Sequence, residues 1–199
     1  MKKKFLVCLA ALYLVSSSVF AAGFEVSPSA TGPQATGCKL YKGGANPVST
    51  VATGAPGTLT CVWAGIPIAP GESFAATAFN DAGESGASNA VVIPNPPLAP
   101  ATMSATVVGG AVSVAWAASA TAVSYTVERS VGVGSTAFAL VASPTTTAYT
   151  DTAVTPGQTY NYIVKAVNNL KFVSPGSSSS VLVPVLIPTA PTGLRVTAG

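Results

Sequence analysis

Short stretches of alternating apolar and polar residues constrain the fold of this 199-residue chain more than any other feature. Three of them lie at 112–116, 125–129 and 160–166. Alternation with a period of two over four to eight residues is typical of a half-buried β-strand. No window of 12 or more residues carries an apolar stripe of helical spacing, and 19 glycines and 16 prolines punctuate the chain. Strands that follow one another without helices predict an all-β sandwich or barrel.

Proline-rich segments indicate how the chain is divided. Residues 95–100 read Asn-Pro-Pro-Leu-Ala-Pro and lie between two strand-rich halves, which is typical of a stiff linker. A second proline-marked boundary occurs at 188–191. We therefore expect a first domain at 22–95, a second at 96–187 and a C-terminal lone strand or tail at 188–199.

The first 21 residues have the layout of a secretion signal. Three lysines at 2–4 are followed by an apolar run at 5–15, and Val19 and Ala21 occupy the −3 and −1 positions of a cleavage site after Ala21. The alternative is a membrane anchor, but a span needs about 20 predominantly apolar residues and three serines at 16–18 interrupt this run. We expect a secreted protein, extracellular or at the cell surface, with the periplasm as the alternative.

The charge balance and the missing histidine exclude most functional classes. The chain has 9 Lys+Arg, 6 Asp+Glu and no histidine, so loss of the three leader lysines leaves a near-neutral mature protein. Nucleic-acid binding requires clustered Lys and Arg. Ser-His-Asp sites, Cys-His sites and nearly every ordinary zinc site require histidine. We therefore expect a non-enzymatic protein without cofactor, nucleic-acid partner or membrane span after cleavage.

Several motifs of the second half occur in a fixed order and spacing. They are Pro100 before a first strand, Trp116 closing the second, 125–129 as the third, and then 147–151, 154–160 and 164–168. In this order they resemble a fibronectin type III module over residues 97–187. The resemblance implies an immunoglobulin-like β-sandwich in which Tyr160 is the tyrosine corner, a buried phenol that bonds nearby backbone. This module occurs in adhesins, receptors and enzyme linkers, so it implies a fold without a function.

The first half resembles the same module incompletely. Its matching segments are 38–42 with 125–129, and 68–74 with 154–160, while 78–85 resembles the last hairpin of the family. Phe74 matches Tyr160 and lacks the corner hydroxyl. Only about 16 mature residues precede Cys38. Phe24 and Val26 can serve in the second strand, which leaves no residues for the first. The resemblance therefore implies two tandem sandwiches, of which the first lacks its first strand.

Cleavage after Ala21 leaves two cysteines, Cys38 and Cys61. An even number of cysteines in an exported chain predicts a disulfide. By the resemblance both side chains point inward from strands of opposite sheets, so the bond would join the two sheets. Two cysteines without histidine make a poor metal site, and we expect no metal there.

Asp81 and Glu84 are the closest pair of carboxylates outside the leader. They lie in a glycine-containing hairpin turn, where Asp and Asn serve backbone geometry, and we expect no catalysis. A calcium site with Asn80 is the alternative, although calcium prefers six or more oxygen ligands. Asp151 is interpreted as a turn residue, and the serines at 177–180 as a flexible start of the last strand rather than O-glycosylation sites.

The C-terminal segment resembles a first strand with nothing after it. Leu194 and Val196 share one strand face and match Met103 and Ala105 of the second module. A sandwich without its first strand leaves an unpaired edge, and an open edge invites strand addition.

These observations favour a secreted, non-enzymatic structural or interaction protein of the cell surface or extracellular matrix. Its strand-donor interface would join Leu194 and Val196 of one copy to Phe24 and Val26 of another, which would produce a head-to-tail filament. Packing of the tail within its own chain remains open, as does a surface polysaccharide as the partner. The alternatives are a carbohydrate- or protein-binding accessory module of an extracellular hydrolase system, or a truncated repeat protein.

Overall fold

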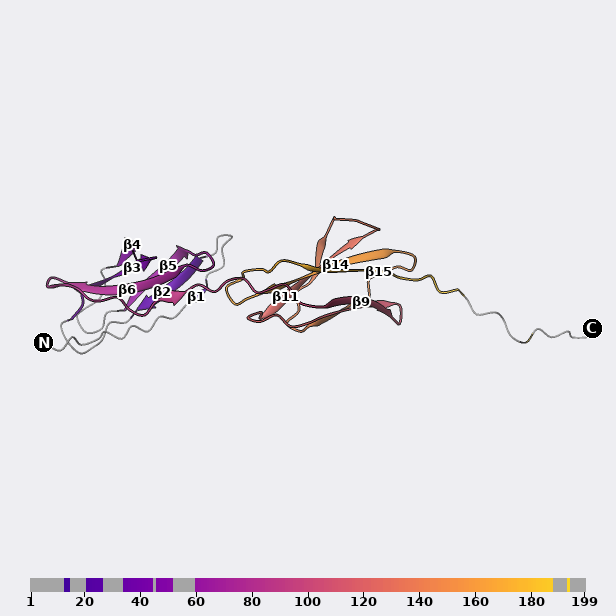
Figure 1. The fold of residues 1–199 in the computed structure, drawn as a ribbon, viewed down its shortest axis with the longest axis horizontal. Coiled ribbons are helices and arrows are strands. Elements are labelled where there is room, and N and C mark those ends of the chain that lie inside the picture. The colour runs from indigo at the N-terminus through magenta and orange to yellow at the C-terminus, as the bar shows by residue number, and fades with distance from the viewer. Residues whose placement is uncertain are drawn as a thin grey trace, which may run out of the picture. The chain divides into compact units, whose positions relative to one another are not determined.

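The computed structural model describes residues 13–14, 21–26, 34–44, 46–51, 60–187 and 193. In these ranges every regular element is a β-strand, which confirms the predicted all-β class (Figure 1). The chain divides into two compact units, Met1–Asn95 and Pro96–Gly199, and each is described by itself. No helix in these ranges is long and apolar enough to cross a membrane.

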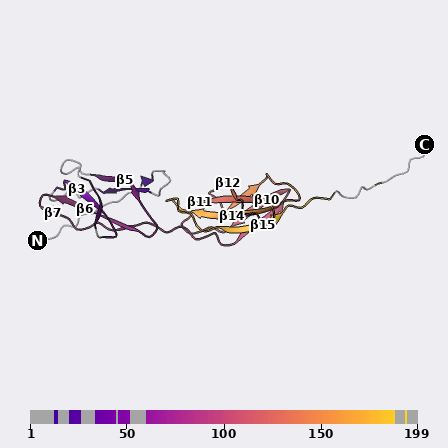
Figure 2. The ribbon, with the colours of Figure 1, turned by 90° about the horizontal axis from the view of Figure 1, so that it is seen from above.

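The second unit is a sandwich of two antiparallel sheets. Its strands are β9 (Met103–Val108), β10 (Ala111–Trp116), β11 (Ser124–Val131), β12 (Ala139–Ala142), β13 (Ala148–Asp151), β14 (Thr159–Val167) and β15 (Ser177–Leu182). One sheet has the order β13-β10-β9 and the other β12-β11-β14-β15; Figure 2 shows the second sheet with β14 beside β15. The serines at 177–180 are the first residues of β15, which corrects the expectation of a flexible segment, because they pair in register with β14.

The core of the second unit lies between its two sheets. Trp116 and Tyr125 are buried, and their rings meet edge to face with centroids 5.4 Å apart. From the edge strand β9, Met103, Ala105 and Val107 pack against this core. These side chains alternate with exposed ones along β9, as the period of two requires. The first strand of the module therefore closes one side of the sandwich with apolar side chains.

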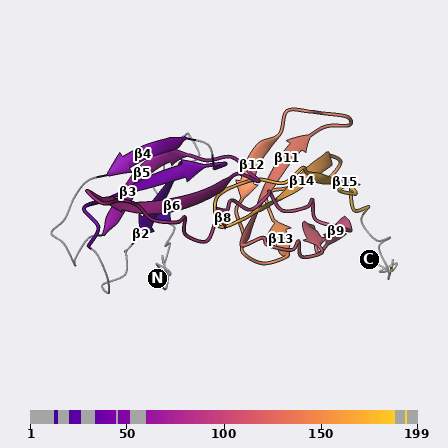
Figure 3. The same cartoon turned by 60° about the vertical axis from the view of Figure 1, so that its left-hand side comes forward.

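The first unit consists of shorter strands in two sheets (Figure 3). They are β1 (Tyr13–Leu14), β2 (Ala21–Val26), β3 (Gly37–Lys42), β4 (Pro47–Val51), β5 (Cys61–Pro67), β6 (Ser73–Asn80), β7 (Gly83–Glu84) and β8 (Val91–Val92). One sheet has the order β1-β2-β5, and the other the order β4-β3-β6-β7, with β8 also paired to β6.

A disulfide joins the two sheets of the first unit. It connects Cys38 on β3 to Cys61 on β5, which is the predicted pairing. Both cysteines are fully buried. Phe24 of β2 and Phe74 of β6 also pack between the sheets, with ring centroids 4.7 Å apart. The small core is thus held by a covalent link as well as by aromatic packing.

The two units repeat the same turn before the sixth strand of the module. In the first unit the Gly71 amide donates to the Ile93 carbonyl, and in the second the Gly157 amide donates to the Val183 carbonyl. The two glycines have φ angles of 79° and 82°, a region that favours glycine. The matching hydrogen bonds give a fixed reference for comparing the two units residue by residue.

Strand β1 comes from the segment that the sequence predicts to be removed. Tyr13 pairs with Gly23 and Leu14 pairs with Ala22, antiparallel to β2. In the second unit the same side of the equivalent strand is occupied by β9. Leader residues 1–12 and 15–20 lie outside the described residues. Among the described residues, the position that β9 takes in the second unit is thus occupied here only by Tyr13 and Leu14.

Candidate functional site

The outer edge of β2 is the candidate site. On one side β2 pairs with β5 along most of its length, from Ala21 to Val26. On the other side the described pairing to β1 covers only Ala22 and Gly23. Phe24, Glu25 and Val26 have no strand beside them there in the described part of the chain. Unpaired backbone groups at a sheet edge are a template for another strand.

An apolar groove opens beside this edge. Its described lining includes Phe24 and Val26 of β2, Leu40 of β3 and Phe74 of β6. The opposite wall comes from residues 88–91, the segment that leads into β8. The cavity at its base has a volume of only about 10 Å³, so the groove is shallow and its apolar side chains are closely packed. It lies between the second and last strands of the sandwich, where a first strand would insert its side chains.

The second unit shows how this place is filled in a complete module. Met103 lies opposite Trp116 and Ala105 lies opposite Val114 along the β9–β10 pair. Strand β9 also lies beside β15, the last strand. The first strand thus bridges the second and last strands with one apolar face inward.

The residues predicted for the strand-donor interface fall into two groups. Phe24 and Val26 lie on β2 with their side chains 3% exposed, so they face the groove from within the sandwich. Leu194 and Val196 lie outside the described residues. Gly193, directly before them, has a φ of 87°.

The Glu84 carboxylate is held by neighbours within its own sheet. It accepts hydrogen bonds from Lys39 Nζ, Tyr41 Oη and Thr77 Oγ1, each 2.5 Å long. The hydrogen bond from Lys39, followed by those from Thr77 and Tyr41, lowers the pKa of Glu84 to about 2. Sequence reasoning assigned Glu84 to the turn and missed this cluster. The sequence feature that indicates it is the spacing of Lys39 and Tyr41, which lie two residues apart on β3 and so point to the same face of the sheet. These hydrogen bonds occupy both carboxylate oxygens.

Asn80 stabilises the hairpin turn directly. Its Oδ1 accepts from the Ala82 amide at 2.9 Å, and its Nδ2 donates to the Gln34 carbonyl at 3.0 Å. Asp81 is exposed at the tip of this turn. The described residues contain no group of three or more His, Cys, Asp or Glu side chains that could hold a metal ion. The side chains of Asn80 and Glu84 therefore serve the hairpin and the sheet.

Asp151 forms the predicted turn contact and also binds two side chains from the other sheet. Its Oδ1 accepts from the Ala153 amide at 2.9 Å, the expected turn contact. Its Oδ2 accepts from Arg129 Nη1 at 2.8 Å and from the Tyr162 hydroxyl at 2.9 Å. The side chain is 1% exposed, so this is a buried charge with three donors. Burial, and then the bond to Asp151, raise the pKa of Tyr162 far above its usual range, so its hydroxyl stays a donor.

The tyrosine corner is present in the second unit and replaced in the first. The Thr155 amide donates to the Tyr160 hydroxyl at 2.8 Å, as the resemblance implies. Phe74 at the matching position has no hydroxyl. Ala69 comes two residues before Gly71, as Thr155 comes two residues before Gly157. The Ala69 amide donates to Glu72 Oε2 at 2.8 Å. A carboxylate from the turn thus takes over the role of the phenol.

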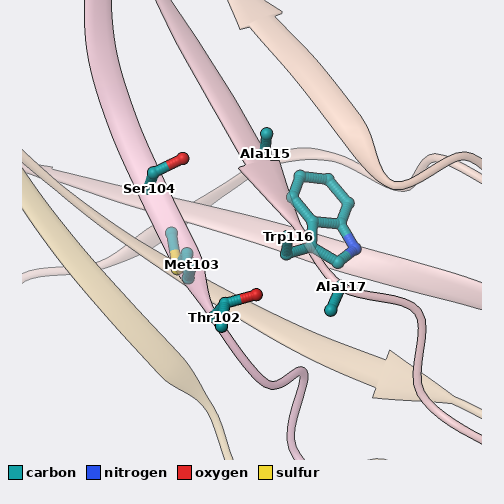
Figure 4. A pocket seen from close by; sticks show the side chains of 6 residues that line it. All are labelled: Thr102, Met103, Ser104, Ala115, Trp116 and Ala117. Atoms are coloured by element: carbon teal, nitrogen blue, oxygen red, sulfur yellow. The ribbon is translucent and has the colours of Figure 1, made fainter.

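A shallow pocket of about 330 Å³ lies at the ends of β9 and β10, lined by Thr102, Met103, Ser104, Ala115, Trp116 and Ala117 (Figure 4). No charged side chain is among these lining residues. Trp116 Nε1 is buried and has no hydrogen-bond partner in the part of the chain that the structure describes. The pocket offers no acid, base or nucleophile stronger than a hydroxyl, so it does not indicate catalytic chemistry.

Comparisons with known proteins place these units among β-sandwich modules. No protein-family model matches the chain, and no curated protein matches it. A Fn3-like protein from Clostridium thermocellum is 32% identical, with 47% of this chain and 100% of that one covered and a TM-score of 0.41. A two-domain fibronectin type III segment of chicken tenascin is 12% identical, with 88% of this chain and 99% of that one covered and a TM-score of 0.42.

Such modules are typically structural or interaction modules without catalysis. The sheet order of the second unit and the corner at Tyr160 agree with the resemblance in the sequence, and this chain covers the whole length of the Clostridium thermocellum protein at 32% identity. The chain belongs to the fibronectin type III family.

Proposed function

We propose that this protein is an exported structural protein that associates with further copies of itself. In this proposal the leader ends at Ala21, residues 22–95 and 96–187 are the two domains, and 188–199 is a donated strand. The single observation that carries it is the edge of β2 at Phe24–Val26, which has no strand beside it among the described residues and lies next to an apolar groove. Residues 188–199 of the same chain carry the sequence pattern of the strand that this edge lacks.

Two further observations support the proposal. The disulfide between Cys38 and Cys61 suits an oxidising compartment such as the cell exterior. The mature chain carries equal numbers of basic and acidic residues, so net repulsion does not oppose association. Repeated donation from one copy to the next is a heterologous contact that need not close, and it produces filaments.

Sedimentation velocity of the protein beginning at Ala22 tests the proposal over a hundredfold range of concentration. The full mature chain should form species that grow with concentration, and deletion of 188–199 should leave a monomer. A double variant, Leu194→Ser with Val196→Ser, should also remain monomeric, because it removes the apolar face. The matched control, Thr192→Ser with Thr197→Ser, should assemble normally. A mature chain that stays monomeric at every concentration, or assembly that survives the deletion, contradicts the proposal.

A further inference from the structure

The second unit provides the register in which a first strand joins this sandwich. Along the antiparallel β9–β10 pair, Met103 lies opposite Trp116, Ser104 opposite Ala115 and Ala105 opposite Val114. Met103 and Ala105 are half-buried against the core, whereas Ser104 and Ala115 are exposed on the outer face. Each inward pair is thus separated by one outward pair.

Strand β2 can be aligned with β10 through their common neighbour in the sheet. Phe24 lies opposite Trp63, and Val114 lies opposite Tyr149. Trp63 comes eight residues before Gly71, and Tyr149 comes eight residues before the equivalent Gly157. Phe24 therefore corresponds to Val114, Glu25 to Ala115 and Val26 to Trp116. Phe24 and Val26 are buried as their counterparts are, and Glu25 is on the outer face.

The tail can be aligned with β9 by the same reasoning. Pro100 is followed two residues later by Thr102, whose φ is 48°. Pro191 is followed two residues later by Gly193, whose φ is 87°. Thr102 lies directly before Met103, where β9 begins, and Gly193 lies directly before Leu194. The shared left-handed backbone before each segment aligns Leu194 with Met103.

Combining the two alignments places opposite charges across the new strand pair. Leu194 comes opposite Val26, Val196 opposite Phe24 and, between them on the outer face, Arg195 opposite Glu25. The six acidic residues that follow Ala21 are Glu25, Glu72, Asp81, Glu84, Glu128 and Asp151. Four of them form ion pairs with described cations, and Glu25 and Asp81 form none among the described residues. Of these two carboxylates only Glu25 lies on the edge strand β2, so it is the one placed to meet a cation from an added strand.

We infer that the edge of β2 takes the 188–199 segment of a second copy antiparallel, in the single register set by an Arg195–Glu25 ion pair. This inference rests on the proposed self-association and adds its geometry. A one-residue slip would turn Leu194 and Val196 outward and bring Arg195 over the apolar groove, so the register is fixed by both faces of the strand. The ion pair adds specificity to the contact because a shifted strand loses it.

A charge-swap cycle in the full mature chain tests the inference. The four proteins are the unmodified chain, Glu25→Arg, Arg195→Glu and the double variant that carries both changes. Directly opposite charges of like sign destabilise a strand pair about as much as opposite signs stabilise it, so each single change should lower the association constant about tenfold. The double variant should recover to within about threefold of the unmodified chain. Asp81→Arg is the matched control, with the same charge change at the other unpaired carboxylate, and it should leave association unchanged.

Each result separates this inference from the proposed function. If deletion of 188–199 abolishes assembly but the double variant stays as weak as the single ones, the strand is donated in another register and the inference is wrong. If the deletion has no effect, the proposed function itself is wrong. The penalty of each single variant should also shrink as salt rises from 0.1 M to 1 M, because screening weakens exposed charges. A penalty independent of salt contradicts an ionic contact.

Discussion

Replacing Tyr162 by phenylalanine removes one hydroxyl from the buried Asp151 cluster of the second unit. The hydroxyl donates to Asp151 Oδ2 at 2.9 Å, and the tyrosine side chain is fully buried. The change leaves the carboxylate with two donors, from Arg129 and from the Ala153 amide. Water cannot replace the lost donor without opening the core, so the buried charge stays under-solvated.

The expected cost follows from the charge of the acceptor. A hydrogen bond to a charged group contributes about 1.5–3 kcal/mol to stability. Tyr162→Phe should therefore lower the free energy of unfolding of the second unit by about 2 kcal/mol. Urea unfolding has a slope of about 1–3 kcal/mol per molar, so the midpoint should fall by about 1 M.

Two-dimensional NMR in urea measures this change for each unit separately. The indole N–H signals of Trp63 and Trp116 report the first and second units, one signal each. Tyr149→Phe is the matched control, because the Tyr149 hydroxyl makes no hydrogen bond with a described residue, and it should change the midpoint by less than a quarter as much. If Tyr162→Phe costs no more than this control, the buried cluster does not stabilise the fold and the reasoning is refuted.

Three further changes test other parts of the structure. Replacing both Cys38 and Cys61 by serine opens a loop with a sequence separation of 23 residues, which should cost the first unit about 3 kcal/mol in urea unfolding and leave the second unchanged. The pKa of Glu84 is about 2 in the folded protein, and its ordinary value is 4.5. Its contribution to the stability of the first unit is therefore present above pH 4.5 and lost as the pH falls to 2. Glu84→Gln should remove this part of the pH dependence of the first unit's urea midpoint. Tyr160→Phe leaves the Thr155 amide without its acceptor. In urea unfolding it should lower the free energy of unfolding of the second unit by about 1 kcal/mol.

The strands and the disulfide could be predicted because they depend on local patterns. Alternation around Trp116 and Tyr125 sets which side chains face the core, and a pleated strand transmits that choice directly to the structure. Cys38 and Cys61 could be paired because the alternation turns both side chains inward and the resemblance places their strands in opposite sheets.

Contacts that join three strands could not be predicted from alternation. Asp151, Arg129 and Tyr162 lie on β13, β11 and β14, and their meeting depends on how the two sheets pack. A register shift between Val127 and Glu128 changes the alternation just before Arg129, which parity alone does not reveal. The scarcity of charges offered the one usable signal, because a lone arginine and a lone aspartate in adjacent motifs tend to pair.

The replaced corner of the first unit shows a second limit. The sequence correctly indicated that Phe74 lacks the hydroxyl of Tyr160. It did not indicate that Glu72, two residues earlier, would accept the Ala69 amide instead. Turn chemistry of this kind depends on side-chain direction within a few residues, and periodicity does not describe it.

Hydrogen exchange of the β2 amides tests the central claim most directly. The account predicts that the amides of residues 22–26 that point away from β5 exchange slowly in the mature chain at high concentration, faster on dilution, and fast at all concentrations after deletion of 188–199. The amides that face β5 should stay protected throughout, because they belong to the pairing within the domain. Protection that is independent of concentration would mean that the tail closes its own domain. Equal exchange with and without the tail would contradict strand donation altogether.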